Sequence, residues 1–265
     1  MQNDVLERHR LALRIAREAG DLLMTYYGRL DTVDRKGSVD FVTEADRASE
    51  QHLIETIHGH FPLDSVLAEE GGHAHQGENE VEWVLDPLDG TTNFIHGFPF
   101  FMVSIGLRIQ GELVAGVCYG PYYQELFSAV RGHGATLNGS PIRVSRTDLL
   151  SDALLATGFP YNRREIMDPL LLRVRRALTA ARGLRRAGAA AYDQCLLAAG
   201  RLDGFFEEGL RAWDVAAGAL IVEEAGGQVS DYQGQPVDLF GPNFLMSNGR
   251  IHDELRRRII DGETS

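Results

Sequence analysis

The most informative stretch of this chain reads Asp86-Pro87-Leu88-Asp89-Gly90-Thr91-Thr92-Asn93-Phe94. It follows an apolar run at 81–85 that alternates as a strand does. Two carboxylates stand three positions apart where this strand is expected to end, and the small residues after them leave the backbone accessible. Carboxylate and carbonyl oxygens at such a corner suit a hard divalent cation, and N–H groups at a helix start suit an anion. A site that offers both is suited to a phosphate ester.

The chain around this stretch is expected to form a mainly antiparallel sheet. Strands are predicted at 66–68, 83–85, 101–109, 113–119 and 125–130. Turn residues separate the later strands, as in Gln110-Gly111, Gly120-Pro121 and Asn138-Gly139. Upstream, near-helical spacing of apolar residues predicts one helix over 4–28 and a second that ends at Phe61-Pro62. Residues 39–46 are expected to be a short connection into this second helix.

Beyond residue 150 shorter strands alternate with helices, which is typical of an α/β arrangement. Strands are predicted at 153–157, 204–207 and 228–230 and helices at 168–182 and 214–225, with a further element at 188–200 whose type stays open. The chain shows no repeat and no long linker. We therefore expect one compact unit with two halves, residues 1–148 and 149–265.

Composition excludes several classes of protein. The chain has 265 residues, 44% hydrophobic and 24% charged, which is ordinary globular composition. No apolar run approaches the roughly 20 residues that a membrane span requires. The net charge of −12 disfavours broad binding to nucleic acid or acidic membranes. An acidic protein that binds a phosphate must reverse the local sign, and bound Mg²⁺ does this directly.

The termini and cysteines point to the cytoplasm. The N-terminal helix is amphipathic and lacks the continuous apolar core of a signal peptide. Cys118 and Cys195 lie far apart and form no metal-spaced pair, so we expect buried free thiols in a reducing compartment.

Acidic residues recur at the ends of predicted strands or the starts of helices: Glu69, Glu70, Asp86, Asp89 and Asp214. Each has a simpler interpretation. Asp214 can be a helix N-cap, Glu69-Glu70 a solvated loop, and Asp86-Pro87 an ordinary turn start. Three such ends together, each flanked by small residues, are harder to explain by packing alone.

Three motifs closely resemble those of the inositol monophosphatase family. They are Leu67-Ala68-Glu69-Glu70-Gly71, the run from Trp83 to Phe94, and Trp213-Asp214-Val215-Ala216-Ala217-Gly218. The resemblance extends to Val42-Thr43-Glu44-Ala45-Asp46, to Gly158-Phe159-Pro160-Tyr161 and to Gly204-Phe205-Phe206-Glu207. It runs in order from about residue 10 to 250, and so covers nearly the whole chain.

This resemblance implies a layered αβαβα sandwich, an α+β half followed by an α/β half, of the inositol monophosphatase and fructose-1,6-bisphosphatase type. It also implies a homodimer that hydrolyses phosphate monoesters with Mg²⁺ and is sensitive to Li⁺. The first half would hold most metal ligands, and the second half would supply Asp214 and substrate contacts.

Residue roles follow from the resemblance by position. The metal ligands would be Glu69, Asp86, the carbonyl of Leu88, Asp89 and Asp214, for two Mg²⁺ ions with Asp86 bridging. Asp46 and Thr91 would orient and deprotonate the attacking water, and Glu70 would lie near a third, weaker ion. The substrate would meet Asp89, Gly90, Thr91, Ala190, Glu207 and Asp214.

General chemistry supports these roles. Clustered carboxylates repel one another until protons or cations neutralise them, and ligands that are all oxygen favour Mg²⁺ over Zn²⁺. A metal pair lowers the pKa of bound water and stabilises both the entering and the leaving oxygen. Phosphoryl transfer then needs positioning and charge neutralisation rather than a nucleophilic side chain.

The sequence leaves the substrate open. Related families that act on histidinol phosphate or 3′-phosphoadenosine nucleotides commonly have Lys after the motif's first Thr, whereas this chain has Thr92. That difference resembles the branch acting on inositol 1-phosphate. Ala189 departs from the Ser or Thr that the family often has, so other polyol or sugar phosphates, including fructose 1,6-bisphosphate, remain alternatives.

A second function comes from another class. Some bacterial proteins that resemble this chain act with RNA or the transcription machinery, and six arginines at 173–186 are the local feature that fits. A solvated helix face with local ion pairs is the favoured interpretation of those arginines.

The histidines are not expected to bind a metal. His73 and His75 have no third ligand nearby for a metal, and His96 is expected to pack or hydrogen-bond in a loop. A catalytically silent homologue is disfavoured by the intact acidic set.

Overall fold

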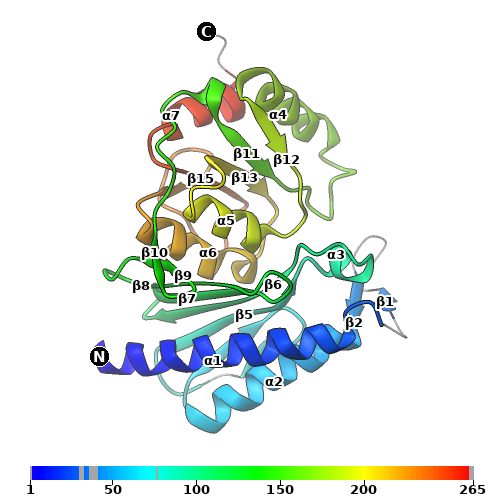
Figure 1. Cartoon of the computed structure of the whole chain (residues 1–265), viewed down its shortest axis with the longest axis vertical. Coiled ribbons are helices and arrows are strands. Elements are labelled where there is room, and N and C mark those ends of the chain that lie inside the picture. Colours follow the sequence, from blue (N-terminus) through cyan, green and yellow to red (C-terminus); the bar gives the residue numbers. More distant parts are fainter. Residues whose placement is uncertain (1, 30–32, 36–40, 76, 263–265) are drawn as a thin grey trace.

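The computed structural model describes residues 2–29, 33–35, 41–75 and 77–262. Five layers alternate along its long axis (Figure 1). Helices α1 and α2 cover one face of an eight-stranded sheet, and α5 and α6 lie between that sheet and a second, five-stranded sheet. Helices α4 and α7 cover the outer face of the second sheet. This is the expected αβαβα sandwich.

The helices have these bounds: α1 Gln2–Tyr26, α2 Glu44–His60, α3 Thr91–Ile95, α4 Met167–Ala180, α5 Ala190–Ala198, α6 Ala212–Glu224 and α7 His252–Leu255. A 3-10 turn spans Leu150–Asp152, and a π-helical segment, Arg256–Asp261, continues α7. The predicted helices at 4–28, 168–182 and 214–225 are thus confirmed to within a few residues, and the element at 188–200 is a helix, α5. The helix that ends at Phe61 is confirmed as α2, whose C-cap is that residue.

The large sheet has the order β10-β9-β8-β7-β6-β5-β3-β4. Its strands are β3 Ser65–Ala68, β4 Gly72–His75, β5 Val81–Asp89, β6 Met102–Ile109, β7 Glu112–Gly120, β8 Glu125–Val130, β9 Ala135–Leu137 and β10 Ser140–Ile142. Only the β3–β5 pair is parallel among these described strands. The predicted antiparallel sheet is confirmed, but β4, β9 and β10 were not predicted because they are short and poor in apolar residues.

The second sheet has the order β12-β11-β13-β15-β14. Its strands are β11 Leu154–Thr157, β12 Gly183–Arg185, β13 Gly204–Glu208, β14 Gln228–Ser230 and β15 Asn243–Ser247. Strand β11 runs parallel to both neighbours, whereas β15 runs antiparallel to β13 and β14. A further pair, β1 Val33–Arg35 and β2 Phe41–Thr43, is antiparallel. The expected connection at 39–46 is therefore wrong in part, because β2 and the start of α2 fall within it, while 39–40 lie outside the described residues.

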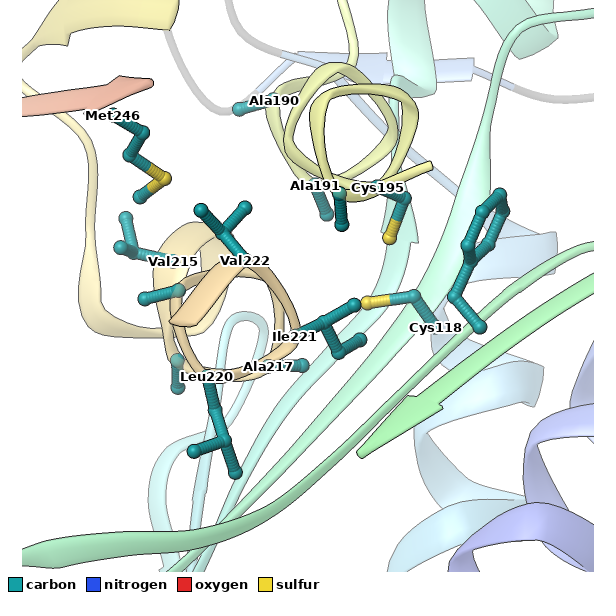
Figure 2. Packing of buried hydrophobic residues seen from close by; sticks show 14 of the residues in the cluster. Cys118, Ala190, Ala191, Cys195, Val215, Ala217, Leu220, Ile221, Val222 and Met246 are labelled. Atoms are coloured by element: carbon teal, nitrogen blue, oxygen red, sulfur yellow. The ribbon is translucent and has the colours of Figure 1, made fainter. Parts of the chain in front are cut away.

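Three hydrophobic cores fill the spaces between the five layers. One joins α1 and α2 to the large sheet, and another joins the second sheet to α4 and the C-terminal helices. Between the two sheets, α5 and α6 form the middle core, where Cys118 and Cys195 are buried free thiols, as expected (Figure 2). None of the described helices is long and apolar enough to cross a membrane.

Helix α6 approaches the large sheet closely because the facing residues are small. A side chain added at Gly106 of β6 would place its Cβ 2.7 Å from Cβ of Ala216. One added at Gly116 of β7 would lie 2.7 Å from the carbonyl oxygen of Ala217. This close packing fixes α6, and with it Asp214, against the strands that follow the first acidic motif.

Candidate active site

A cleft of about 1120 Å³ opens between the two halves of the molecule. It is lined by residues of the large sheet, of α3, of the loop after β11 and of the starts of α5 and α6. Six carboxylates contribute to its wall: Glu69, Asp86, Asp89, Asp193, Glu207 and Asp214. Acids that are remote in sequence therefore line the same cleft.

The parallel pairing of β3 with β5 brings the first two acidic motifs together. Ala68 pairs with Leu85, so Glu69, directly after β3, lies beside Asp86 of β5. The expectation that the strand ends at residue 85 is wrong, because β5 continues through Asp86 to Asp89. The N–H of Glu69 donates to the carbonyl of Leu85 at 3.2 Å, which continues this register. Strand order alone therefore places Glu69 next to the Asp86 motif.

A bulge in β5 explains how Asp86 and Asp89 both reach the cleft. Residues three apart in a regular strand point to opposite faces. Here Asp86 pairs with Ser104 and Asp89 with Met102, so β5 has one residue more than β6 across this step. Pro87 lies inside the bulge, where its missing N–H costs no ladder hydrogen bond. The extra residue restores the side-chain parity and turns both acids to the same side.

The motif then turns into α3 through Gly90. Gly90 has a φ of +95°, and a Cβ there would lie 2.9 Å from the carbonyl oxygen of Phe100. Both facts require glycine. Thr91 begins α3, and its hydroxyl lies 3.1 Å from Oδ1 of Asp46 and 3.2 Å from the carbonyl of Leu88.

Asp46 is held rigidly at the start of α2. Its Oδ2 accepts hydrogen bonds from the N–H and hydroxyl of Thr43, while the Thr43 hydroxyl in turn caps the helix. Asp46 is fully buried, and this burial raises its pKa even though the hydrogen bonds oppose the shift. The predicted Asp46–Thr91 pair is therefore present as a hydrogen-bonded contact.

Asp89 is anchored by the N-terminus of α5. Its Oδ1 accepts from the N–H of Ala190 at 3.0 Å, and its Oδ2 accepts from Ala191 at 2.8 Å and Tyr192 at 3.3 Å. Ala189, the N-cap residue, offers no side-chain acceptor. The carboxylate of Asp89 thus caps a helix whose N–H groups lie 101 to 103 residues later in the chain. The positive end of the helix dipole stabilises the negative charge.

Asp214 lies in the first turn of α6, where its Oδ2 accepts from the N–H of Arg211 at 2.7 Å. The carbonyl of the preceding residue, Trp213, accepts from Ser104 Oγ on β6 at 3.3 Å. The helix start is therefore tied to the same strand pair that holds Asp86. The N-cap interpretation of Asp214 is wrong in detail, because Arg211 is the N-cap residue and Asp214 is the third residue of α6, whose carboxylate reaches back to the N-cap N–H.

The acids of the cleft raise one another's pKa values. Burial raises the pKa of Asp86 well above its usual range, and the charges of Glu69, Asp89 and Asp214 add to the shift. Burial and then Asp214 raise the pKa of Asp89 to about 7, against the three N–H bonds from α5. The cleft therefore concentrates negative charge that water does not fully solvate, and a cation would relieve it.

The donor set suits a hard divalent cation. The candidate ligands Glu69, Asp86, Asp89 and Asp214 and the carbonyl of Leu88 all offer oxygen. Within the described part of the chain, no three Asp, Glu, His or Cys side chains converge on one point as a ready-made coordination shell. The fit to Mg²⁺ thus rests on the chemistry of the donors, their shared cleft and their mutual repulsion.

Glu207 and Asp193 form a second acidic wall from the other half of the molecule. Glu207 on β13 is 8% exposed and Asp193 on α5 is 2% exposed. Burial raises the pKa values of both carboxyl groups. The charges of Asp193 and Asp214 raise the pKa of Glu207 further, and that of Asp89 raises the pKa of Asp193. The positive charge of Arg186 lowers both pKa values. A Cβ at Gly158 would lie 1.9 Å from Oε1 of Glu207, so the glycine makes room for this carboxylate.

Sequence reasoning missed Asp193 and Arg186 as parts of the cleft. A signal for Asp193 existed, because it is the only charged residue in the otherwise apolar or neutral segment Ala190–Ala198. Arg186 was grouped with a basic stretch, yet it lies over the ring of Phe159, 5.1 Å from its centroid. Its guanidinium is the cationic counterpart of the acidic wall.

Other predicted residues have mixed outcomes. Ala190 and Gly90 line the cleft, but Glu70 is not among the described lining residues, and its N–H donates to Oε2 of Glu50. His96 is exposed and hydrogen-bonds through its ring to the carbonyl of Thr92, as expected for a loop histidine. The side chains of His73 and His75 lie outside what the structure describes.

The basic stretch is largely occupied by local contacts. Arg173 pairs with Glu208 and Arg182 with Asp152, and Arg176 donates to the carbonyls of Ile259 and Ile260. The expected solvated helix face is therefore only partly correct: Arg173 and Arg182 form ion pairs, but Arg173 is largely buried and Arg182, Arg185 and Arg186 follow the end of α4. Arg175 is exposed on α4.

Comparison with known proteins settles the family. A family model described as "Inositol monophosphatase family" matches residues 4–263. The chain belongs to the inositol monophosphatase family. The "Inositol-1-monophosphatase" of Synechocystis is 45% identical over 252 residues, covering 93% of this chain and 88% of the relative.

Two further proteins resemble nearly the whole chain. The "Nus factor SuhB" of Escherichia coli K12 is 44% identical over 243 residues, 91% of each chain. The solved structure of inositol monophosphatase from Anabaena superposes with a TM-score of 0.85 at 43% identity, covering 95% of this chain and 96% of that one. Family membership implies a phosphatase, and the family is generally metal-dependent.

Proposed function

We propose that this protein is a Mg²⁺-dependent phosphate monoester hydrolase that releases phosphate from inositol 1-phosphate. One observation carries the proposal: carboxylates of β5, of the residue after β3 and of the first turn of α6 share a cleft in which burial and mutual charge hold the pKa values of Asp86 and Asp89 high. Such a cleft attracts a divalent cation, and the cation supplies the positive field that a phosphate dianion needs. The name of the Synechocystis relative supports the choice of substrate.

Glu69, Asp86, the carbonyl of Leu88, Asp89 and Asp214 would hold two Mg²⁺ ions, and a third ion would lie near Glu70. Bound Mg²⁺ lowers the pKa of water and stabilises the oxygens that enter and leave phosphorus. The chain's own contribution is to fix the donors. The α5 N–H groups hold Asp89, and the N–H of Arg211 holds Asp214.

The Thr91–Asp46 pair would orient the attacking water and accept its proton. Thr91 Oγ1 lies 3.1 Å from Asp46 Oδ1, and the raised pKa of Asp46 makes that carboxylate a better proton acceptor than an exposed one. The backbone at Gly90 and Thr91 would receive the phosphate. Because the reaction needs no covalent intermediate, positioning of water and phosphate suffices.

Glu207 and the α5 N-terminus near Ala190 would face the alcohol part of the substrate. A polyol offers several hydroxyl donors, which match the carboxylate acceptors of Glu207 and Asp193. Asp193 was not predicted from the sequence, and we add it to the substrate wall. We also propose that the protein forms a homodimer and that Li⁺ inhibits its phosphatase activity.

A panel of phosphate esters tests the proposal. Phosphate release should require Mg²⁺, stop with a chelator, and be fastest with inositol 1-phosphate. The competitors are fructose 1,6-bisphosphate, histidinol phosphate and 3′-phosphoadenosine 5′-phosphate. A faster reaction with one of these would reassign the substrate, and Mg²⁺-independent hydrolysis would reject the reaction scheme.

The variant Asp89→Asn should lower turnover about 100-fold or more, because one anionic ligand is lost. It should also cost about 1–2 kcal/mol of stability, since the amide accepts fewer of the α5 N–H bonds. Asp152→Asn is the matched control: this carboxylate pairs with Arg182 away from the cleft and is half exposed. Activity is measured on protein shown to be folded by circular dichroism. Near-wild-type turnover of Asp89→Asn would contradict the ligand scheme.

The relatives named as Nus factors favour one additional role, in the transcription machinery. A salt-dependent pull-down with RNA polymerase or RNA tests it. Charge reversal should be confined to Arg175, because Arg176 holds the C-terminal segment through the carbonyls of Ile259 and Ile260. Binding that is lost in Arg175→Glu with catalysis unchanged would support the role; no binding at low salt would reject it.

A further inference from the structure

Gln194 is a fully buried polar side chain whose partner is the backbone beside a proposed metal ligand. It belongs to α5 and is 0% exposed. Its Nε2 donates to the main-chain carbonyl of Asp214 in α6 at 2.9 Å. Its Oε1 is also buried and has no hydrogen-bond partner among the described residues.

Packing alone does not explain this residue. A carbonyl oxygen only accepts, so the NH₂ group must face Asp214 and the amide cannot be flipped. The buried Oε1 then remains unsatisfied, which is unfavourable in an apolar core. An apolar side chain of similar size would avoid that cost. The contact with the Asp214 carbonyl is therefore what distinguishes glutamine at this position.

Gly218 completes the contact from the side of α6. It lies one helical turn after Asp214. A Cβ on Gly218 would be 2.2 Å from Oε1 and 2.9 Å from Cβ of Gln194. The glycine thus gives the Gln194 side chain access to the backbone of α6. Figure 2 shows the two helices side by side, with Ala191 and Cys195 directed from α5 into the space between them.

Helix α5 contacts both acidic segments of the cleft. Its first N–H groups bind the carboxylate of Asp89, and Gln194 binds the turn that carries Asp214. These contacts are only three or four residues apart on α5, roughly 5 Å along its axis at 1.5 Å per residue. One short rigid element therefore sets the spacing between two carboxylates that belong to different halves of the chain.

We propose that Gln194 is a positioning residue that fixes Asp214 relative to Asp89 through α5. Its consequence for metal binding rests on the proposed function, in which both carboxylates hold Mg²⁺. The positioning itself is a property of the polypeptide and can be measured without metal. Removing the amide should loosen the first turn of α6 while the packed helix pair stays folded.

The test variant is Gln194→Met, which keeps the volume and flexibility of the side chain but has no N–H donor. Gly218→Ala is a second, independent variant, because its Cβ displaces Gln194 instead of removing it. Ser230→Ala is the control for loss of a buried hydroxyl elsewhere: Ser230 is 3% exposed and hydrogen-bonds His252 on the far side of the second sheet.

The chain provides its own reporters, because it has two tryptophans. Trp213 directly precedes Asp214 and lines the cleft, whereas Trp83 is fully buried in the core under α1 and α2. In metal-free protein labelled with 5-fluorotryptophan, Gln194→Met and Gly218→Ala should shift or broaden the ¹⁹F resonance of Trp213 and leave that of Trp83 unchanged. Ser230→Ala should change neither resonance.

Calorimetry with Mg²⁺ then measures the consequence. Both variants should bind Mg²⁺ about tenfold more weakly than wild type, as outer-shell changes commonly do, and the control should bind within twofold of it. An unchanged Trp213 resonance, or unchanged Mg²⁺ affinity where the wild type binds Mg²⁺, overturns the inference. A wild type that binds no Mg²⁺ overturns the proposed function instead, and the Trp213 resonance still decides the positioning.

Discussion

Asp64 shows how much of this fold depends on single buried charges. It is 1% exposed and accepts from Arg8 Nε at 2.7 Å and Nη2 at 2.8 Å, from Asn79 at 2.7 Å and from Trp83 Nε1 at 2.8 Å. Burial pushes the pKa of Asp64 upward, but these hydrogen bonds and the Arg8 charge outweigh it and hold the pKa below its usual value. The guanidinium also lies over Phe61, 4.2 Å from the ring centroid. One carboxylate therefore joins α1, the loop after α2 and β5.

Replacing Asp64 by Asn should lower the free energy of unfolding by about 3–5 kcal/mol, because the buried Arg8 guanidinium loses the carboxylate that accepts from two of its nitrogens. Asp152→Asn provides the exposed comparison, since a surface pair contributes about 0–1 kcal/mol. Urea denaturation of both variants measures the difference. Equal losses in the two would show that burial does not strengthen the Arg8–Asp64 interaction.

Not every such residue can be found from the sequence. Arg8 and Asp64 are 56 positions apart, and nothing local in either segment indicates the pair. Asp86 and Asp89 were predicted to meet at one corner, and they do. The reason was not foreseeable, because their spacing in a regular strand would separate them and only the bulge at Pro87 brings them together.

At the scale of elements, α5 is capped from outside its own sequence. The Asp89 carboxylate takes the N–H groups of Ala190, Ala191 and Tyr192, so the N-cap residue Ala189 needs no acceptor. This arrangement explains how the chain tolerates alanine where a hydroxyl residue is the usual cap.

Ala189→Ser should therefore change the free energy of unfolding of the wild type by less than about 0.5 kcal/mol, because the first N–H groups of α5 already donate to Asp89 and not to the serine hydroxyl. In an Asp89→Ala background the same serine should stabilise by about 1 kcal/mol, the usual gain from a cap. Chemical denaturation of the four proteins measures this coupling. A full gain in the wild-type background would show that Asp89 does not cap α5.

Element boundaries followed from periodicity where the apolar pattern was long. Helices α1 and α6 and strands β6–β8 were predicted within a few residues because one face of each is continuously apolar. Strands β9, β10 and β12 have only three residues each, too few to show a period. Their pairing is set by tertiary contacts, which no local pattern encodes.

At the scale of the whole molecule, His9 on α1 makes the stability of the fold depend on pH. Nε2 of His9 is buried, with no hydrogen-bond partner in the described part of the structure. Burial, with the charges of Arg10 and His133, lowers the pKa of His9 to about 4. The pKa of His9 is therefore lower in the native state than in the unfolded chain, where it is about 6.5. The stability that neutral His9 contributes is complete above about pH 6.5 and is lost as the pH falls toward 4.

Between pH 7 and pH 4.5, wild type should lose about 2 kcal/mol more stability than His9→Leu, which has no titrating group at this position. The carboxylates titrate alike in both proteins, so the difference isolates His9. Thermal or urea unfolding at the two pH values gives the measurement. Parallel losses in both proteins would place His9 in contact with water.

The layered architecture was predictable at this scale through the family resemblance, but its physical logic is visible only in three dimensions. Five layers separate three cores, and the cleft lies where α5 and α6 meet the edge of the large sheet. Asp86, Glu207 and Asp214 come from the large sheet, the second sheet and the helices between them, yet line one cavity. Only the folded chain shows why Asp193 and Gln194, on an apolar helix, belong with them.

Mg²⁺ binding to wild type and to Asp86→Asn, measured by isothermal titration calorimetry at pH 7.5 with no substrate, gives the most direct test. Asp86 is 1% exposed, and the charges of three acidic neighbours, Glu69, Asp89 and Asp214, act on it. We expect wild type to bind Mg²⁺ and Asp86→Asn to bind at least about tenfold more weakly. A wild type without measurable Mg²⁺ binding, or equal affinity in the two proteins, would contradict the assignment of this cleft as the metal-dependent phosphatase site.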